Sequence, residues 1–415
     1  MESENLAVIT SFPQKGVIHD KVVVGIASYT KNTLLALKKY NPSLKITVFA
    51  EILSGKKENY EDNGILVKRV WKRNSFLIFP TLIKNAYSLN KDTKNVLVEF
   101  EVAMFGDFFY LLFFPVFLLF LRISGRKTTI VMHQVISDIN ELSGHINLKS
   151  GKKALVLNFF ISSFYRTILL LASKAIVFDK VLKDKLSKYT DTKKIIVIPH
   201  GVEQFKDDVS RHSAREKLKI SSNDFVVLYF GFLAWYKGAD WLINAFDAKK
   251  AKENGIKLVM AGGGNPNHLN KKYYQDYLEN IKIVCKEKGI VLTGFVNEED
   301  IPLYFKAADV VVLPYRTLMS SSGPLSIAFS FGKAFITSNA LEEIFDTQDL
   351  KELLESKGLS KQDLIFSSFD EFNSLVRKLK TNKEFGGGVE DLSLEIAKKR
   401  SWEVIGKRYY EEIFS

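Results

Sequence analysis

Cysteine is almost absent from this chain, because Cys285 is the only one among 415 residues. A single thiol cannot form an internal disulfide, and it cannot supply a cysteine cluster for structural zinc or an iron–sulfur group. The sequence also has no zinc-finger spacing, no RNA-recognition signature and no long basic block with interleaved aromatic residues. We therefore expect a cytoplasmic protein of a reducing compartment, with no nucleic-acid partner.

Three other signals are missing. No Asp-x-Asp pair occurs, so the usual carboxylates for a metal-bound diphosphate are lacking, and we expect no metal site. The run Gly262–Gly264 does not form a GxGxxG motif, and no acidic residue stands where a ribose would need one. We therefore expect no nicotinamide cofactor. The first residues, MESENLAVITSFPQKG, lack a basic stretch followed by an apolar core and do not predict a signal peptide.

Long apolar runs are also scarce, and the most apolar window, Phe108 to Leu121, is short for a membrane span. It has 14 uncharged residues, against the roughly 20 that a spanning helix needs. Basic residues follow it directly, which is typical of a helix that lies in the membrane interface. We expect peripheral membrane contact through residues 105–127. These basic residues are Arg122, Arg126 and Lys127.

A second stretch, Lys149 to Lys174, has a similar mixture of basic, aromatic and apolar residues. For this stretch we favour a helix that faces the core of its domain. The whole chain has 59 Lys and Arg against 47 Asp and Glu, a formal charge of +12. This excess suits an anionic partner, such as anionic lipid or a phosphorylated substrate, and does not choose between them.

Apolar runs and helix-forming stretches alternate along the chain, which predicts an α/β fold with parallel sheets. The polar stretch from Glu203 to Asp224 predicts a connection between two domains of about 200 residues each. The strand-like runs of the first half are short and rich in β-branched residues. They lie at residues 6–12, 46–50, 65–71, 95–102, 128–135 and 175–180.

The stretch from Asp309 to Ser338, DVVVLPYRTLMSSSGPLSIAFSFGKAFITS, predicts strand, loop, helix and strand. Proline is favoured at the first helical position, so the helix should begin near Ser322, Gly323 and Pro324. Serine hydroxyls and the free N–H groups of a helix start suit a phosphate oxygen. An ordinary capped connection has the same spacing, so the pattern alone leaves both interpretations open.

This stretch resembles the donor-site motif of the family 4 glycosyltransferases, with its PY, SSG and GK elements. Three more segments match the family in order: Val226 to Phe246, with Gly231, Lys237 and Gly238 in place; TGFV at 293–296; and IPHGV at 198–202. The resemblance implies the GT-B fold, two facing Rossmann-like domains with a cleft between them. The domains would be residues 1–203, on the acceptor side, and 204–390, which bind the donor. Residues 391–415 would return to the first domain.

The resemblance also implies the residues that bind a nucleotide-diphosphate sugar, a co-substrate that needs no further cofactor. Lys237 is the strongest candidate for the diphosphate. Where most members have Gly-Arg after the strand, this chain has Phe232, and Arg316 is a hypothetical substitute for the missing cation. The expected donor-binding residues are Gly231, Lys237, Phe295, Arg316, Ser321, Ser322, Gly323 and Pro324.

In the first half, VEFEVAMFG at 98–106 resembles an element found in a mannosyltransferase-like subset of the family. Glu101 would be a general base or bind a sugar hydroxyl, and a surface or ion-paired glutamate is the alternative. His133 ends a predicted strand, as in the family, and could orient or deprotonate the acceptor; a core histidine is the alternative. Gly16 and His19 would border the acceptor, although a solvated loop histidine is the favoured interpretation of His19.

Most family members have two glutamates eight residues apart before the GK turn, whereas this chain has SSGPLSIAFSFGK with no carboxylate. The usual retaining chemistry is therefore in doubt, and inverting chemistry with a base from the first domain is possible. We expect transfer of a hexose, mannose or glucose, to a saccharide or lipid-linked saccharide at the cytosolic membrane face. The alternatives are a nucleotide-sugar epimerase of the same fold and a non-catalytic partner subunit. Sugar, nucleobase, acceptor, linkage and stereochemistry stay open.

Overall fold

The computed structural model describes most of the chain between Glu4 and Ser415. The description leaves out residues 18–25, 54, 102–103, 107, 138–151, 204–208, 266–268, 270 and 318–321. Two compact units are present. Unit 1 contains the described residues up to Gly201 together with Trp402–Ser415, and unit 2 contains the described residues from Val202 to Ser401.

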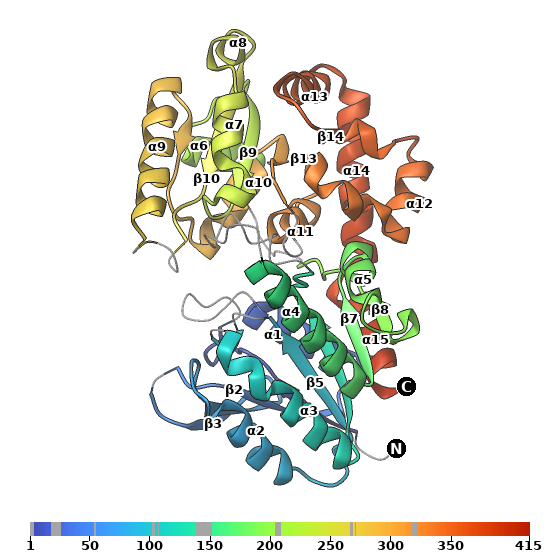
Figure 1. Ribbon diagram of the computed structural model, residues 1–415. Coiled ribbons are helices and arrows are strands. Elements are labelled where there is room, and N and C mark those ends of the chain that lie inside the picture. The colour runs from blue at the N-terminus through green and yellow to red at the C-terminus, as the bar shows by residue number, and fades with distance from the viewer. Residues whose placement is uncertain are drawn as a thin grey trace. The chain divides into compact units, whose positions relative to one another are not determined.

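The sheet of unit 1 has the strand order β3-β4-β2-β1-β5-β6-β7-β8 (Figure 1). All neighbouring pairs are parallel except β3 with β4, and Val8 of the central β1 lies opposite both Val48 and Leu97. Because helices cover both faces, the central strands are apolar and buried along their length. The strands are β1 (Asn5–Ile9), β2 (Lys45–Glu51), β3 (Glu58–Asp62), β4 (Ile65–Trp71), β5 (Asn95–Phe100), β6 (Lys127–Met132), β7 (Lys174–Val177) and β8 (Ile195–Val197).

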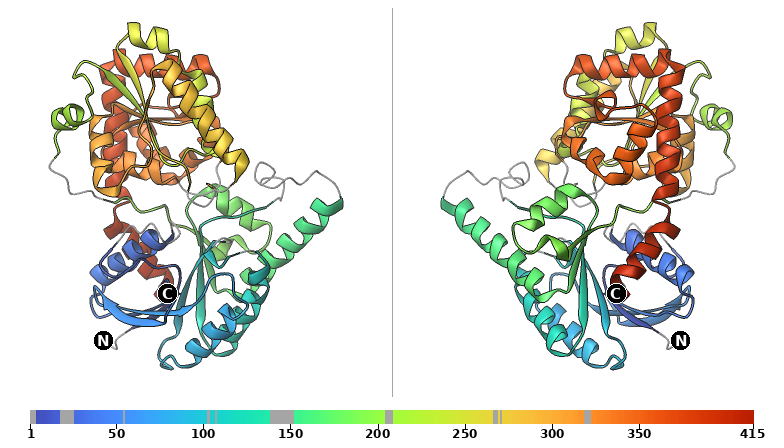
Figure 2. Two further views of the ribbon diagram at one scale, coloured as in Figure 1. Left: turned by 90° about the vertical axis from the view of Figure 1, so that its left-hand side faces the viewer. Right: turned by 90° about the vertical axis from the view of Figure 1, so that its right-hand side faces the viewer.

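Helices pack on both faces of this sheet, with α1 and α15 together on one and α2, α3 and α4 on the other (Figure 2). The C-terminal helix α15 packs so closely on α1 that a Cβ on Gly406 would come 2.6 Å from Cβ of Ala36. The helices of unit 1 are α1 (Ile26–Tyr40), α2 (Ile78–Tyr87), α3 (Phe114–Ile123), α4 (Lys152–Leu171), α5 (Lys180–Ser187) and α15 (Trp402–Phe414). Two 3-10 turns, η2 (Phe108–Phe113) and η4 (Thr192–Lys194), complete it.

Four strands of unit 1 end earlier than the apolar pattern predicts, one of them β7, which ends at Val177 instead of Lys180. The strands β1, β5 and β6 stop at Ile9, Phe100 and Met132, whereas the predicted runs extend two to three residues further. Glu101 and His133 therefore stand in the loops at the carboxyl edge of the sheet, which is the edge where open parallel sheets bind ligands.

The helix α4 differs from the core-facing helix favoured by sequence. Ile161, Tyr165 and Ile168 are buried, but Leu155 and Phe159 are 72% and 68% exposed. The segment Ala154–Leu171 has the length and the apolar composition of a helix that crosses a membrane. Of its 18 residues, 28% are buried inside the protein. Because large apolar residues stand on both the buried and the exposed side of α4, the sequence does not reveal which side faces the sheet.

Unit 2 has a six-stranded, wholly parallel sheet in the order β11-β10-β9-β12-β13-β14. Val227 and Tyr229 of β9 point into one core cluster, and Val226 and Leu228 point into the other. The strands are β9 (Phe225–Phe230), β10 (Ile256–Ala261), β11 (Val291–Leu292), β12 (Val310–Leu313), β13 (Ala334–Ser338) and β14 (Ile365–Phe366).

The helices of unit 2 form a layer on each face of the sheet (Figure 1). The helix α14 runs through position 391, the expected start of the returning segment, and belongs to unit 2. The helices are α6 (Arg211–Lys217), α7 (Ala239–Ala245), α8 (Ala248–Glu253), α9 (Lys272–Lys288), α10 (Ile301–Ala307), α11 (Gly323–Ser330), α12 (Gln348–Ser356), α13 (Phe369–Thr381) and α14 (Lys383–Lys399). Short 3-10 turns are η5 (Trp235–Lys237), η7 (Glu298–Asp300), η8 (Asn339–Asp346) and η9 (Lys361–Asp363).

Candidate functional site

Backbone segments meet closely at the carboxyl edge of the unit 2 sheet. Gly231 follows β9 with φ +119°, a value that favours glycine, and a Cβ there would lie 3.1 Å from Nζ of Lys237 and 3.6 Å from Pro324. Gly262 follows the neighbouring β10, and a Cβ on it would come 1.9 Å from the carbonyl oxygen of Gly231. Both positions therefore require glycine, and they bring three of the predicted donor-binding residues together.

Lys237 is the last residue of the turn η5. The residue after it, Gly238, cannot be replaced by another residue unless the backbone moves. Gly238 has φ +70°, and a Cβ on it would come 1.7 Å from the carbonyl oxygen of Pro314. Burial lowers the pKa of Lys237 to about 8, and its ammonium lies 6.0 Å from the ring centre of Tyr315. Among the described residues no ion pair includes this lysine. An anion bound beside it would supply the missing negative charge.

The start of α11 lies in the same region. Ser322 is its N-cap: its hydroxyl accepts a hydrogen bond from Leu325 N at 3.3 Å and lies 3.1 Å from the hydroxyl of Tyr315. Of the described residues beyond its chain neighbours and its own helix, none has an atom within 4 Å of the position that a Cβ on Gly323 would take. The first N–H groups of a helix have no acceptor within the helix, so an open helix start beside an ammonium suits a phosphate.

Arg316 does not join this group as a free cation. Its guanidinium makes two hydrogen bonds of 2.7 Å to the carboxylate of Asp240, and it donates a third to the carbonyl of Trp235. Burial tends to raise the pKa of Asp240, but the bonds and charge of Arg316 outweigh it and lower that pKa. Arg316 thus ties the loop after β12 to the start of α7, and its charge is already neutralised.

Phe295 lies in the loop after β11 and is half exposed. Its ring lies beside that of Phe232, with 6.3 Å between the ring centres. A Cβ on Gly263 would come 2.7 Å from Phe295 N, so the loops after β10 and β11 touch. Two aromatic rings at a ligand-binding edge offer a surface on which a nucleobase can stack.

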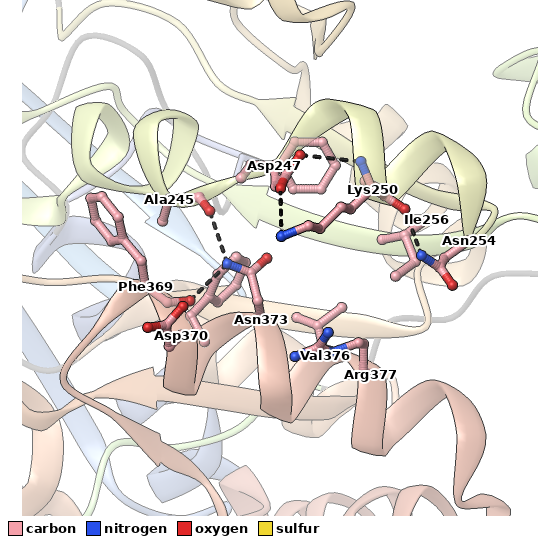
Figure 3. A pocket seen from close by; sticks show the side chains of 13 residues that line it. Ala245, Asp247, Lys250, Asn254, Ile256, Phe369, Asp370, Asn373, Val376 and Arg377 are labelled. Carbon is pink, nitrogen blue, oxygen red and sulfur yellow. Dashed lines mark hydrogen bonds and ion pairs between the residues drawn. The ribbon is translucent and has the colours of Figure 1, made fainter.

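Two pockets of about 240 Å³ each lie in unit 2. One is at the carboxyl ends of β12, β13 and β14 and is lined by Pro314, Tyr315 and Ser338, next to the donor-binding residues. The other lies between α8 and α13 beside Ile256, which begins β10, so it is at the opposite edge of the sheet (Figure 3). There Asn373 donates to the carbonyls of Ala245 and Phe369, so its amide hydrogens already have acceptors.

The polar residues of unit 1 gather at the carboxyl ends of β5 and β6. Glu99 is fully buried, and its carboxylate lies 2.6 Å from Nε2 of His133. Tyr29 and Phe178 contact the imidazole edge to face, each with 5.0 Å between ring centres. Burial raises the pKa of Glu101, against the nearby charges of His133 and Arg73. The two predicted catalytic residues thus lie in one cluster, with Glu99 as a third member that sequence did not suggest.

The loop of Gly16 is fixed by a buried ion pair. Gly16 N donates to Asp62 at 3.4 Å, and Nζ of Lys31 lies 2.6 Å from the same carboxylate oxygen and 2.7 Å from the carbonyl of Val17. His19 and Ser321, which were also expected at the site, lie outside the described residues.

A second pair of buried groups, missed from sequence, holds the loop after β1. The carboxyl of Glu51 bonds to the hydroxyl of Ser11 and accepts from Phe12 N at 3.2 Å. Burial raises the pKa of Glu51 despite these bonds. The buried guanidinium of Arg69 donates to the carbonyls of Phe12 and Pro13 at 3.1 and 2.6 Å. The hint in the sequence is slight: Arg69 lies inside a strand-like run, and Glu51 directly follows another.

Comparisons with known proteins relate part of the sequence to a known family and the whole chain to known folds. Residues 224–362 match the family "Glycosyl transferases group 1". Mannosylfructose-phosphate synthase of Agrobacterium fabrum is 28% identical over 180 residues, 38% of this chain and 38% of that protein. The chain spans less than two thirds of the length of the curated relatives it matches first.

Solved structures resemble the whole chain. Sucrose-phosphate synthase from Thermosynechococcus elongatus superimposes with a TM-score of 0.70 at 15% identity, with 99% of each chain covered. Anabaena HepE in complex with UDP-glucose gives a TM-score of 0.64, also at 15% identity and 99% coverage of each chain. The two sheets are thus those of the GT-B fold, and residues 224–362 are similar to the group 1 glycosyltransferases.

Proposed function

We propose that this protein is a glycosyltransferase that moves a hexose from a nucleotide-diphosphate sugar to a saccharide or lipid-linked saccharide. The observation that carries the proposal is Lys237: a partly buried lysine, without an acidic partner among the described residues, beside Gly231 and the start of α11. Hexose transfer is also supported by the family match of residues 224–362 and by the printed name of the mannosylfructose-phosphate relative.

In the proposed reaction a hydroxyl oxygen of the acceptor forms a bond to the anomeric carbon of the donor sugar. The bond from that carbon to the diphosphate oxygen breaks, and its electron pair stays with the leaving diphosphate. Lys237 and the first N–H groups of α11 stabilise the growing negative charge. The acceptor proton passes to the Glu101 and His133 cluster of unit 1, because α11 carries no carboxylate.

The nucleobase is proposed to stack on Phe232 and Phe295. The solved HepE complex with UDP-glucose makes a uridine nucleotide and glucose the first donor to test. The element around Glu101 that resembles the mannosyltransferase-like subset makes a guanosine nucleotide and mannose the second. The proposed acceptor lies at the cytosolic face of a membrane, which the protein contacts peripherally through residues 105–127.

Metal independence is part of the proposal. The chain has no Asp-x-Asp pair. Lys237 and the start of α11 supply positive charge to the diphosphate without a metal ion. Transfer should therefore continue in the presence of a chelator. Loss of turnover on chelation, restored by magnesium or manganese, would contradict it.

The deciding experiment measures thermal stabilisation by UDP, GDP, ADP and their sugar conjugates, with Lys237→Ala beside the wild type. A ligand at 100 times its dissociation constant adds about 2.7 kcal/mol of stability. We expect stabilisation by one nucleotide class, with most of it lost in the variant. No stabilisation by any nucleotide would sink the proposal in favour of a non-catalytic subunit. If a sugar conjugate binds, product analysis separates transfer from epimerisation of the donor.

A further inference from the structure

Exposed apolar side chains concentrate on three neighbouring segments of unit 1. Among the described residues, more than half of the exposed large hydrophobic side chains belong to residues 76–87, 109–123 and 155–170, which we call the α2–α4 surface. Single exposed apolar residues are normal, but a gathering of this kind marks an interaction site. Six that are more than half exposed are Leu77, Phe109, Ile123, Leu155, Phe159 and Phe160.

The α2–α4 surface is a folded part of unit 1. The helix α3 packs against both α2 and α4, and the three lie together on one face of the sheet (Figures 1 and 2). Within α3, Phe117 and Leu118 are buried while Val116 and Leu119 are exposed, so one helix has two apolar sides. Arg122 donates to the carbonyl of Leu170 at 2.6 Å and joins the ends of α3 and α4. The apolar side chains are therefore displayed by a fixed scaffold.

The charge of this region has one sign. Residues 76–87, 109–123 and 155–170 hold three basic residues and no aspartate or glutamate. Lys84 of α2, Arg122 of α3 and Arg166 of α4 are exposed. Aromatic and aliphatic side chains edged by cations fit the boundary between anionic headgroups and acyl chains.

A second copy of the chain fits this surface poorly. In a symmetric dimer the same patch meets itself, so the cations of one copy would face those of the other. A crossing of the bilayer by α4 also disagrees with the packing. Ile161, Tyr165 and Ile168 are buried in the core of unit 1, and the hydroxyl of Tyr165 accepts a hydrogen bond from Ile136 N at 3.1 Å.

We infer that the α2–α4 surface docks unit 1 onto an anionic lipid bilayer, with its exposed apolar side chains in the headgroup boundary. The inference deepens the membrane part of the proposed function, because it adds α4 and the residues before α2 to the predicted contact at 105–127. It also names the lipid chemistry, a bilayer with anionic headgroups.

The test is co-sedimentation of the full chain with vesicles of phosphatidylcholine mixed with phosphatidylglycerol, and with phosphatidylcholine alone. We expect binding to the mixed vesicles and much weaker binding to the neutral ones. Burial of each phenylalanine contributes about tenfold or more to partitioning, so Phe109→Ser with Phe159→Ser should weaken binding about 100-fold. Lys84→Gln with Arg166→Gln should weaken binding to mixed vesicles by about tenfold or more.

The matched controls lie on α9 of unit 2, where Tyr273 and Ile283 are also exposed. Tyr273→Ser with Ile283→Ser should leave vesicle binding unchanged, and all variants should keep the wild-type melting temperature. Equal binding by the Phe109 and Phe159 variant, or equal loss in the α9 control, would overturn the inference. A dimer that this variant converts to monomer would overturn it in favour of a second copy. Release from membranes by detergent but not by alkaline carbonate would indicate a span instead.

The binding test uses no donor, so it is independent of transfer. Failure of nucleotide stabilisation with intact vesicle binding would sink the proposed function alone. Failure of vesicle binding with intact nucleotide stabilisation would sink this inference alone.

Discussion

The two units use buried charge in opposite ways. In unit 1, Lys31 is paired with Asp62 and His133 with Glu99, and these contacts position loops. In unit 2, the partly buried Lys237 has no ion-pair partner among the described residues, and desolvation lowers its pKa to about 8. A paired buried charge stabilises the loop that carries it, whereas an unpaired one costs stability and is available to a ligand.

We expect the largest effect on stability from removing one partner of the buried Lys31–Asp62 pair in unit 1. The side chains of Lys31 and Asp62 are 1% and 5% exposed, so Lys31→Met leaves an isolated buried carboxylate. We expect the free energy of unfolding to fall by about 3–5 kcal/mol, measured by denaturant titration. Adding Asp62→Asn should recover part of the loss. A single variant as stable as the wild type would show that the pair is not buried as described.

The same change in unit 2 should have the opposite outcome. Lys237→Met removes a buried charge, so stability should be unchanged or higher, while kcat/KM should fall by about 100- to 1,000-fold. Lys333 is the matched control, because burial also lowers its pKa to about 8 but its ammonium bonds to the carbonyl of Ala308 at 2.9 Å. Lys333→Met should reduce stability rather than donor binding. If Lys237→Met and Lys333→Met lower the free energy of unfolding by the same amount, the two lysines do not differ as described.

Glu99→Gln tests whether the carboxylate of unit 1 acts through His133. The amide keeps the shape of the side chain but loses its charge, so we expect kcat to fall about 10- to 100-fold. The affinity for the nucleotide should not change, because no donor-binding residue is touched. Glu99→Asp should recover part of the activity. A variant with weaker nucleotide binding and normal kcat would assign Glu99 a different role.

The pH dependence of nucleotide binding sharpens the contrast further. Affinity for the diphosphate should be constant below the Lys237 pKa of about 8 and should fall by up to about tenfold per pH unit above it. The free energy of unfolding changes with pH in the opposite direction to the nucleotide affinity. The folded pKa lies below the ordinary 10.5, so the unfolded chain binds more protons between these values, and the free energy of unfolding rises with pH there. Calorimetry at several pH values should show both effects, and Lys237→Met should abolish both.

The smallest expected effect is that of Gly323→Ala. The position is open, so the extra methyl group should change the free energy of unfolding by no more than about 0.5 kcal/mol. It would, however, occupy the space proposed for the diphosphate, and nucleotide affinity should fall about tenfold. Unchanged affinity would place the diphosphate elsewhere.

The proximity of several candidate donor-binding residues was predictable because their spacing is local. Gly231 and Lys237 are six residues apart. Ser322 is the N-cap of α11, a helix start that Pro324 predicts. The state of Arg316 was not predictable, because its partner Asp240 is 76 residues away and no periodic pattern relates them. The same holds for Glu99 and His133, which are brought together only by the pairing of β5 with β6.

The fold class and the two sheets followed from the alternation of apolar runs. The orientation of α4 did not, since large apolar residues occupy its exposed side as well as its buried side. The exposed half of α4 became visible only when its packed residues, Ile161, Tyr165 and Ile168, were located in the core.

The return of α15 to unit 1 has a consequence for the order in which the protein can fold during synthesis. Ile405, Tyr409 and Ile413 belong to the core of unit 1, and the hydroxyls of Tyr409 and Tyr29 are 2.7 Å apart. A nascent chain that has left the ribosome only as far as Gly201 therefore exposes the side of α1 that α15 will cover. Unit 2 emerges before that helix and can finish folding first, although domains usually fold from the N-terminus.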